Sequence, residues 1–213
     1  MQQITIRDID AKDIPDIHCV IRTIWDWDDV SDDQAVVDAT VGMYLNDVLY
    51  DSTFGKIALL GDQVVGVIFG SVEGQPAIFR GVQTNSMEHM MVLLGASDDD
   101  RHNIYDYLSK LRGAYEQLIC GREDGYDGTL DFLVLSEDAR GMGIGKKLWH
   151  ELTKYFKAHK VQTIYVYTDT DCNFGFYEHL GFARIGEKMV AFEEYGESYT
   201  ENIFLYDYRF EQE

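Results

Sequence analysis

Hydrophobic and polar positions in the N-terminal third of the chain repeat with the periods of strands and helices in turn. A short alternating run comes first, and Asp13-Ile14-Pro15 then predicts a helix start, because a carboxylate can cap free amides and proline fits the first turn. We expect this helix to reach about Trp25 and a second one to run from Gln34 to about Leu49. Two strand-like runs, 56–60 and 64–72, follow as a hairpin. The predicted order is strand, helix, helix, strand, strand.

Residues 74–128 lose this rhythm. They contain an apolar patch, an acidic run at Asp98-Asp99-Asp100, a helical stretch from Ile104 to Ile119 and a glycine-rich segment. About 50 residues are marginal for an independent core, so we interpret this segment as an insertion within one domain that covers residues 1–213. Three roles stay open for it: an ordered lid, a solvated decoration and a contact between two copies in a homodimer.

The segment from Thr129 onwards predicts the centre of the fold. Residues 129–135 are almost unbroken in hydrophobicity, as expected of a strand that is covered on both faces in the middle of a sheet. A glycine-rich turn leads from this strand into an amphipathic helix that begins at about Gly143. The remaining predicted elements are a strand at 163–167, a short helix from Asn173 to Gly181, and strands at about 182–192 and 202–210.

The charge of the chain excludes one class of partner. Acidic residues number 38 against 18 basic ones, and the formal net charge is −20. Such a mean field repels DNA, RNA and other polyanions, so nucleic acid is not an expected partner. It also favours a cationic substrate, but a solvated acidic surface that keeps the protein soluble is the preferred explanation of the charge.

Neither a metal site, a disulfide framework nor a membrane anchor is indicated. The three cysteines are far apart and show no spacing of the zinc-binding type. The longest conspicuous apolar run, Met90–Leu94, is far shorter than the roughly 20 residues needed to span a bilayer. Because the first residues also lack the pattern of a signal or transit peptide, we expect a cytoplasmic location.

The strand at 129–135 runs into Arg140-Gly141-Met142-Gly143-Ile144-Gly145 and then into a helix. Such a turn presents free backbone N–H groups and the positive end of the helix dipole, which suit a phosphate or pyrophosphate. The phosphate-binding loop of NTPases needs four residues between its glycines and a hydroxyl after the lysine, but only three residues separate Gly141 from Gly145 and Lys146-Lys147 follows. The dinucleotide fingerprint fails as well, because Lys146 stands where its third glycine belongs. What remains is Arg-x-x-Gly-x-Gly.

A second signal lies downstream, in Asn173-Phe174-Gly175-Phe176-Tyr177-Glu178-His179-Leu180-Gly181-Phe182. With the 140–145 turn it resembles the GNAT acetyltransferases, whose two central signatures are the pyrophosphate turn and an Asn-x-x-x-Phe/Tyr-Tyr-Glu-x-x-Gly-Phe segment. The resemblance is strong over about 129–182, and the order of the other elements agrees with it except at 74–128. It implies the GNAT fold, an α/β (α+β) architecture with a central mixed, mostly antiparallel sheet of about six to seven strands flanked by helices. Here a helical insertion would precede the central strand.

The resemblance also implies an activity and a cosubstrate. The expected reaction is acetyl-CoA-dependent N-acetyl transfer to a primary amine of a small molecule or peptide, by direct attack and without a metal. The backbone of Leu133, Val134 and Leu135 would pair with the pantetheine arm, Asn173 would hydrogen-bond the pantetheine, and Tyr177 would sit beside the thioester sulfur. The pyrophosphate would be held by Arg140, Gly141, Met142, Gly143, Ile144, Gly145 and Lys146.

Acetyl transfer requires a neutral amine, a stabilised oxyanion and a proton for the leaving thiolate. The Tyr177 phenol can donate that proton, although packing alone is the competing explanation for this residue. The family's frequent glutamate falls on Thr129, so Asp131 on the same strand face is the best acidic candidate for the base. Loss of the amine proton to solvent also stays open, as do Glu73, Asp127 and Tyr105.

Two other functions stay open. A non-catalytic acyl-CoA-binding sensor or regulatory module on the same fold is the main alternative, and Thr129 at the usual base position favours it. An O-acyl or succinyl transferase would use the same scaffold. The presence of Tyr177 favours catalysis over the binding module.

Overall fold

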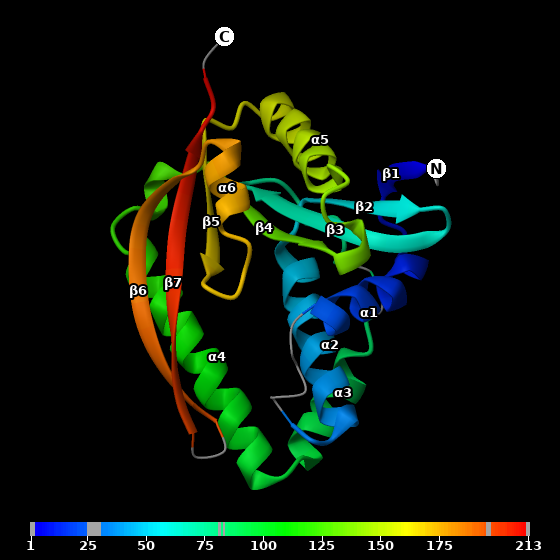
Figure 1. Ribbon diagram of the computed structural model, residues 1–213, viewed down its shortest axis with the longest axis vertical. Helices are drawn as coiled ribbons and strands as arrows, with labels where there is room; N and C mark the ends of the chain where they lie inside the picture. The colour runs from blue at the N-terminus through cyan, green and yellow to red at the C-terminus, as the bar shows by residue number, and fades with distance from the viewer. Residues whose placement is uncertain (1–2, 25–30, 81, 83, 195–196, 212–213) are drawn as a thin grey trace. The chain divides into compact units, whose positions relative to one another are not determined.

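The computed structural model describes residues 3–24, 31–80, 82, 84–194 and 197–211 (Figure 1). Its contacts divide the chain into two compact units. Unit 1 consists of Met1–Gly95 with Leu130–Lys160, and unit 2 consists of Ala96–Thr129 with Val161–Glu213. Each unit has a hydrophobic cluster of its own. The predicted end of the first helix at Trp25 lies outside the described residues.

Unit 1 is a sheet with helices on both faces (Figure 1). Strand β1 pairs antiparallel with β2, and β2 pairs antiparallel with β3. Strand β4 lies beside β3, and the Ser136 amide just after it donates to the Val65 carbonyl at 2.9 Å. The elements are β1 Ile4–Asp8, α1 Ile14–Ile24, α2 Gln34–Asp51, β2 Phe54–Leu60, β3 Gln63–Val72, α3 Ser86–Gly95, most of β4 Gly128–Leu135, and α5 Ile144–Ala158.

The core of unit 1 lies between the sheet and helices α1 and α2. Ile17 of α1 and Leu45 of α2 belong to one buried cluster with Phe132 of β4. Helix α5 packs against β2 and β3 from the opposite face of the sheet (Figure 1). Its inward residues follow the predicted helical spacing, since Leu148 and Leu152 are fully buried. The position of α5 is therefore fixed by its apolar face.

The apolar patch at 87–94 forms helix α3, which packs against α2. The contact depends on Gly42, because a Cβ there would lie 2.1 Å from Cε1 of His89. Glycine therefore allows a close approach of the two helices. Met87 and Leu94 point away from this contact and are exposed. The patch thus belongs to a surface helix and contributes little to the core.

Unit 2 is a second layered arrangement. Strand β5 pairs antiparallel with β7 and β7 pairs antiparallel with β6, while β4 pairs parallel with β5 through Gly128–Ile164 and Thr129–Tyr165. Helix α4 covers one face, where Ala114 clusters with Phe192 and Ile203. The elements are α4 Asp98–Ile119, β5 Thr163–Asp169, α6 Gly175–Leu180, β6 Ala183–Glu194 and β7 Glu197–Arg209.

The strand order β1-β2-β3-β4-β5-β7-β6 gives a seven-stranded mixed sheet, which confirms the predicted fold class. The predicted insertion at 74–128 contributes α3 to unit 1 and α4 to unit 2. The expectation that β4 is covered on both faces was wrong. Phe132 and Val134 are buried, whereas Asp131, Leu133 and Leu135 on the other face are only half-buried. The unbroken apolar run of β4 therefore includes one face that is apolar but less covered.

The acidic run of the insertion forms the first turn of α4. The Ser97 hydroxyl accepts a hydrogen bond from the Asp100 amide at 3.0 Å, and Asp98 forms an ion pair with Arg101. Carboxylates at a helix N-terminus interact favourably with the helix dipole. Part of the acidity of the insertion therefore has a local role in starting α4.

A partly buried ion pair ties β1 to the short turn that precedes α1. Both terminal nitrogens of the Arg7 guanidinium donate to Asp13, at 2.6 and 2.8 Å, and the Asp10 amide donates to Asp13 at 2.7 Å. The hydrogen bonds from Arg7 hold the pKa of Asp13 below its usual value. Because the folded-state pKa is lowered, the stabilisation is complete above the unfolded-state pKa and is lost as the pH falls through the folded one.

We expect Asp13→Asn to lower the free energy of unfolding by about 1.5–3 kcal/mol at pH 7, because it leaves Arg7 without its charged acceptor. Urea denaturation of parent and variant at pH 7 and at pH 3 measures the effect. The difference should shrink at the lower pH, where the parent carboxylate begins to bind a proton. A difference that is the same at both pH values would show that the charge of Asp13 does not contribute.

Candidate functional site

The glycine turn of unit 1 combines two left-handed residues with a helix start. Gly141 has φ 76° and Gly143 has φ 73°, a region that residues with a Cβ rarely adopt. Gly143 is also the N-cap of α5, and no side chain caps the amides that follow it. The fully buried Ile144 side chain holds the first turn of α5 against the core. The chain therefore turns sharply from β4 and presents the N-terminus of α5 outward.

The electrostatics of this turn favour an anion. The first turn of α5 has no acidic residue, and Lys146 and Lys147 stand there, both exposed. A cation near the positive end of a helix dipole is locally unfavourable, and a bound anion would relieve both charges. Arg140 is also exposed and forms an ion pair of 3.5 Å with Glu137. The uncapped amides, the positive end of the helix dipole and the cationic side chains thus all belong to residues 140–147.

Strand β4 leads into this turn and carries the predicted pantetheine positions. Leu135 packs over Gly66 of β3, where a Cβ would lie 2.4 Å from its Cδ2 and 3.1 Å from the Val134 carbonyl oxygen. Glycine at this point lets β3 and the end of β4 approach closely. Gly128 and Thr129 of β4 pair with β5, and Leu133, Val134 and Leu135 come after these paired residues.

Asp131, the predicted base, is held by two hydroxyl groups of unit 1. Ser52 donates to its Oδ2 at 3.1 Å, and Ser71 donates to the same oxygen. Ser52 ends α2 and Ser71 lies near the end of β3, so the carboxylate joins three elements. A carboxylate has about four acceptor positions, and these hydroxyls occupy two of them. The geometry gives Asp131 a structural role besides any role in proton transfer.

The second signature forms the end of helix α6 in unit 2. Gly181 has φ 93°, its amide donates to the Glu178 carbonyl at 3.1 Å, and the Phe182 amide donates to the Tyr177 carbonyl at 3.0 Å. These two bonds define a Schellman motif, in which an apolar contact between the flanking residues is typical. That contact is present, because the rings of Tyr177 and Phe182 lie 5.6 Å apart. The spacing Tyr-x-x-x-Gly-Phe therefore has a structural explanation.

Asn173 lies at the other end of the same segment and is exposed. Its carbonyl accepts the Phe176 amide at 3.0 Å, and upstream the Asp169 carboxylate accepts the amides of Asp171 and Cys172. The loop between β5 and α6 is thus shaped by local hydrogen bonds. Asn173 therefore lies in the loop just before α6, and Tyr177 lies within that helix.

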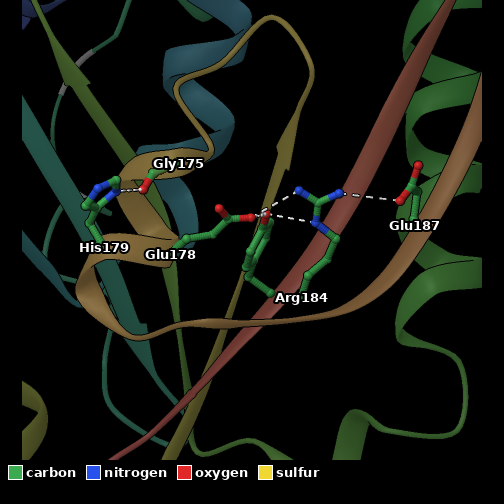
Figure 2. A network of polar contacts seen from close by, with 6 residues as sticks. Gly175, Glu178, His179, Arg184 and Glu187 are labelled. Atoms are coloured by element: carbon green, nitrogen blue, oxygen red, sulfur yellow. Dashed lines mark hydrogen bonds and ion pairs between the residues drawn. The ribbon is translucent and has the colours of Figure 1, made fainter.

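A polar network links α6 to β6 and β7, and it was not predicted from the sequence (Figure 2). The Glu178 carboxylate accepts the Tyr206 hydroxyl at 2.8 Å and the Arg184 guanidinium at 3.2 Å, and Arg184 Nε also donates to the Tyr206 oxygen at 2.8 Å. Arg184 and Tyr206 face each other on β6 and β7. No signal in the sequence reveals this pairing, because it depends on the register of two strands.

Histidines near the site have ordinary roles. The His179 ring lies 2.5 Å from the Gly175 carbonyl oxygen (Figure 2), and the His159 ring lies 2.9 Å from that of Tyr155. Within the described residues, no group of three or more potential ligands could hold a metal ion. In the same part of the chain, no helix is both long and apolar enough to cross a bilayer.

Comparison with known proteins identifies the family. The model of the acetyltransferase (GNAT) family matches residues 21–182. The uncharacterized N-acetyltransferase ycf52 of Porphyra purpurea is 31% identical over 62 residues, which make up 29% of this chain and 35% of that protein. The chain therefore matches only about a third of the length of this curated relative.

Solved structures share the fold at low sequence identity. The structure of smu.2055 from Streptococcus mutans UA159 has a TM-score of 0.55 and 16% identity, covering 96% of this chain and 98% of that one. The polyamine N-acetyltransferase of Drosophila melanogaster has a TM-score of 0.56 and 12% identity, covering 98% and 100%. The family match extends over more than half of the sequence and includes both signatures, and the chain belongs to the acetyltransferase (GNAT) family of acetyl-transferring enzymes.

Proposed function

We propose that this chain is an acetyl-CoA-dependent N-acetyltransferase that moves the acetyl group to a primary amine of a small molecule or peptide by direct attack. The observation that carries the proposal is the uncapped N-terminus of α5, with left-handed Gly141 and Gly143 before it and Lys146 within its first turn. This arrangement suits the pyrophosphate of CoA. Arg140, Met142, Ile144 and Gly145 complete the proposed cradle.

The basic character of α5 supports the same assignment. The helix carries four lysines and one glutamate in a protein whose net charge is −20. CoA is an anion, and the mean field of this protein would repel it. Two of these lysines, Lys146 and Lys147, lie at the N-terminus of α5, where they would offset that repulsion at the proposed binding site.

The proposed chemistry keeps the roles that the family resemblance implies. The backbone of Leu133, Val134 and Leu135 would hold the pantetheine arm, with an N–H near Leu135 available to the oxyanion, and Asp131 would be the base that accepts the amine proton. Asn173 would hydrogen-bond the pantetheine, and the Tyr177 phenol would donate its proton to the thiolate that leaves when the amide bond forms. We propose a cytoplasmic, metal-free enzyme.

A non-catalytic acyl-CoA-binding module is the second candidate. Two observations favour it: Thr129 occupies the usual base position, and the ring of Tyr177 is already used in the Schellman contact. Both candidates predict CoA binding at the α5 turn. They differ in whether thiol is released from acetyl-CoA when amines are supplied.

The acceptor is proposed to be a cationic amine. The supporting observation is the acidity of the chain, including the Asp98-Asp99-Asp100 turn of α4. Acidic surfaces raise the local concentration of cations in a manner that salt suppresses. A polyamine, an aminoglycoside-like amine and a lysine-bearing peptide share this chemistry.

CoA should raise the melting temperature of the parent, and Gly143→Val should abolish this shift. Valine disfavours the left-handed backbone that opens the N-terminus of α5, and its side chain would enter the space above the amides. The matched control is Gly61→Val, since Gly61 has φ 65° and an equally open surrounding in the β2–β3 turn. Thermal melts with and without CoA measure both variants. An undiminished shift in folded Gly143→Val would contradict the pyrophosphate assignment.

Tyr177→Phe should lower turnover about 10- to 1000-fold with little change in CoA affinity, because it removes a proton donor and keeps the ring. Thiol release from acetyl-CoA over a panel of amines measures turnover. The fold should persist, since phenylalanine retains the contact with Phe182. Turnover equal to that of the parent would show that Tyr177 has only a packing role. If the parent itself releases no thiol with any amine, the non-catalytic binding module is favoured.

Changing Asp98, Asp99 and Asp100 together to Asn should raise KM for a cationic amine about two- to fivefold at low ionic strength and flatten its dependence on salt. Affinity for CoA should not fall. Initial rates at several salt concentrations provide the comparison. Identical KM values and salt dependence in parent and variant would show that the acidic turn does not select the substrate and only helps to start α4.

A further inference from the structure

Helix α6 is too short to hold its own orientation. It spans six residues, Gly175–Leu180, and its N-cap residue Phe174 makes no side-chain capping hydrogen bond. Isolated helices below about 12 residues are marginal, so such a turn takes its position from tertiary contacts. The Schellman motif closes its C-terminal end, but those bonds are internal to the segment. The contacts that hold α6 against the sheet must therefore come from other elements.

One arginine supplies that connection at the start and the centre of the segment. The Arg184 guanidinium lies 3.9 Å from the ring centroid of Phe204 and 5.2 Å from that of Phe174, which precedes the helix. The same guanidinium donates to Glu178 in the middle of the helix. It is therefore in contact with the start and the centre of α6 while its backbone belongs to β6.

The Tyr206 hydroxyl completes the connection from β7. It donates to Glu178 and accepts from Arg184, so both of its hydrogen-bonding functions are used. Burial, together with the hydrogen bond to Glu178, raises the pKa of Tyr206, which keeps this hydroxyl protonated. Its ring is fully buried and lies 6.2 Å from the ring of Tyr177. Glu178 is thus tied to two strands directly beside Tyr177.

We propose that Arg184 and Tyr206 are positioning residues that set the orientation of the Tyr177 phenol by holding Glu178. The inference rests on the proposed function, because it requires Tyr177 to act in acetyl transfer. Arg184 is suited to this task, since its planar guanidinium stacks on a ring and donates in two directions at once. A lysine would keep the charge but lose the planar stacking and the fixed geometry of the two donors. A displacement of about 1 Å at a reacting group can cost about 100-fold in rate.

A double-mutant cycle between Tyr206→Phe and Tyr177→Phe tests the inference. Tyr206→Phe keeps the ring and removes the hydroxyl, and we expect kcat to fall about 5- to 50-fold with KM for acetyl-CoA changed less than about twofold. In the Tyr177→Phe background the same change should alter kcat less than about twofold, because the network would act only through the Tyr177 phenol. Tyr199→Phe removes a hydroxyl elsewhere on β7 and should match the parent.

Two conservative variants extend the cycle. Arg184→Lys should behave like Tyr206→Phe, and it replaces Tyr206→Phe in the cycle if that protein does not fold. Glu178→Gln keeps an acceptor for the Tyr206 hydroxyl and should lose less activity than Tyr206→Phe. Amide exchange of the 177–182 segment should quicken in Tyr206→Phe and in Arg184→Lys, but not in Tyr199→Phe.

The outcomes separate this inference from the proposed function. Equal losses of kcat in both backgrounds would assign the network a general structural role and overturn the inference. A large loss in Tyr177→Phe with parent-like Tyr206→Phe and Arg184→Lys would overturn the inference and leave the proposed function intact. Parent-like turnover in Tyr177→Phe would remove the role of Tyr177 itself, and the inference would fail with it.

Discussion

The site depends on one constraint: the first amides of α5 must stay uncapped and yet be fixed in space. Most helices satisfy these amides with a side chain, which would also block them. Here Gly143 occupies the N-cap without offering such a side chain, and the buried Ile144 holds the first turn in place. Three other features support this arrangement. They are the left-handed glycines, the apolar face of α5 and the close approach of β3 and β4 at Gly66. The proposed anion site would then consist of backbone N–H groups at a helix N-terminus, with the cationic Lys146 beside them.

The charge distribution follows a related logic. If a protein with a net charge of −20 uses an anionic cosubstrate, as we propose, it must separate its cations from its acids. The lysines are concentrated on α5, whereas an acidic run lies in the first turn of α4, where a helix dipole favours it. The helix dipole thus accounts for acids at the start of α4, and the proposed anion would account for the lysines at the start of α5. Net charge alone would have suggested neither position.

The sequence predicted the order of elements and both signature segments because these depend on local periodicity and on glycines with special backbone angles. It misjudged β4, since an apolar side chain such as Leu133 gives no sign of whether its face is covered. It also could not reveal the tie from Glu178 to Tyr206, which depends on the register of β6 with β7. Asp131 was recognised as a candidate base, but its bonds to Ser52 and Ser71 join elements distant in sequence. Long-range pairing, rather than composition, limits such predictions.

The Schellman motif at the end of α6 has a consequence for how this family is recognised. Gly181 and the contact between Tyr177 and Phe182 stabilise a helix end, whatever chemistry takes place beside them. In a descendant that lost acetyl transfer, a left-handed glycine and an apolar contact at this spacing would still stabilise the fold. Pattern searches built on this segment would therefore score an inactive paralogue as highly as a working enzyme. The hydroxyl of Tyr177, which packing does not require, is the part of the motif that could distinguish the two.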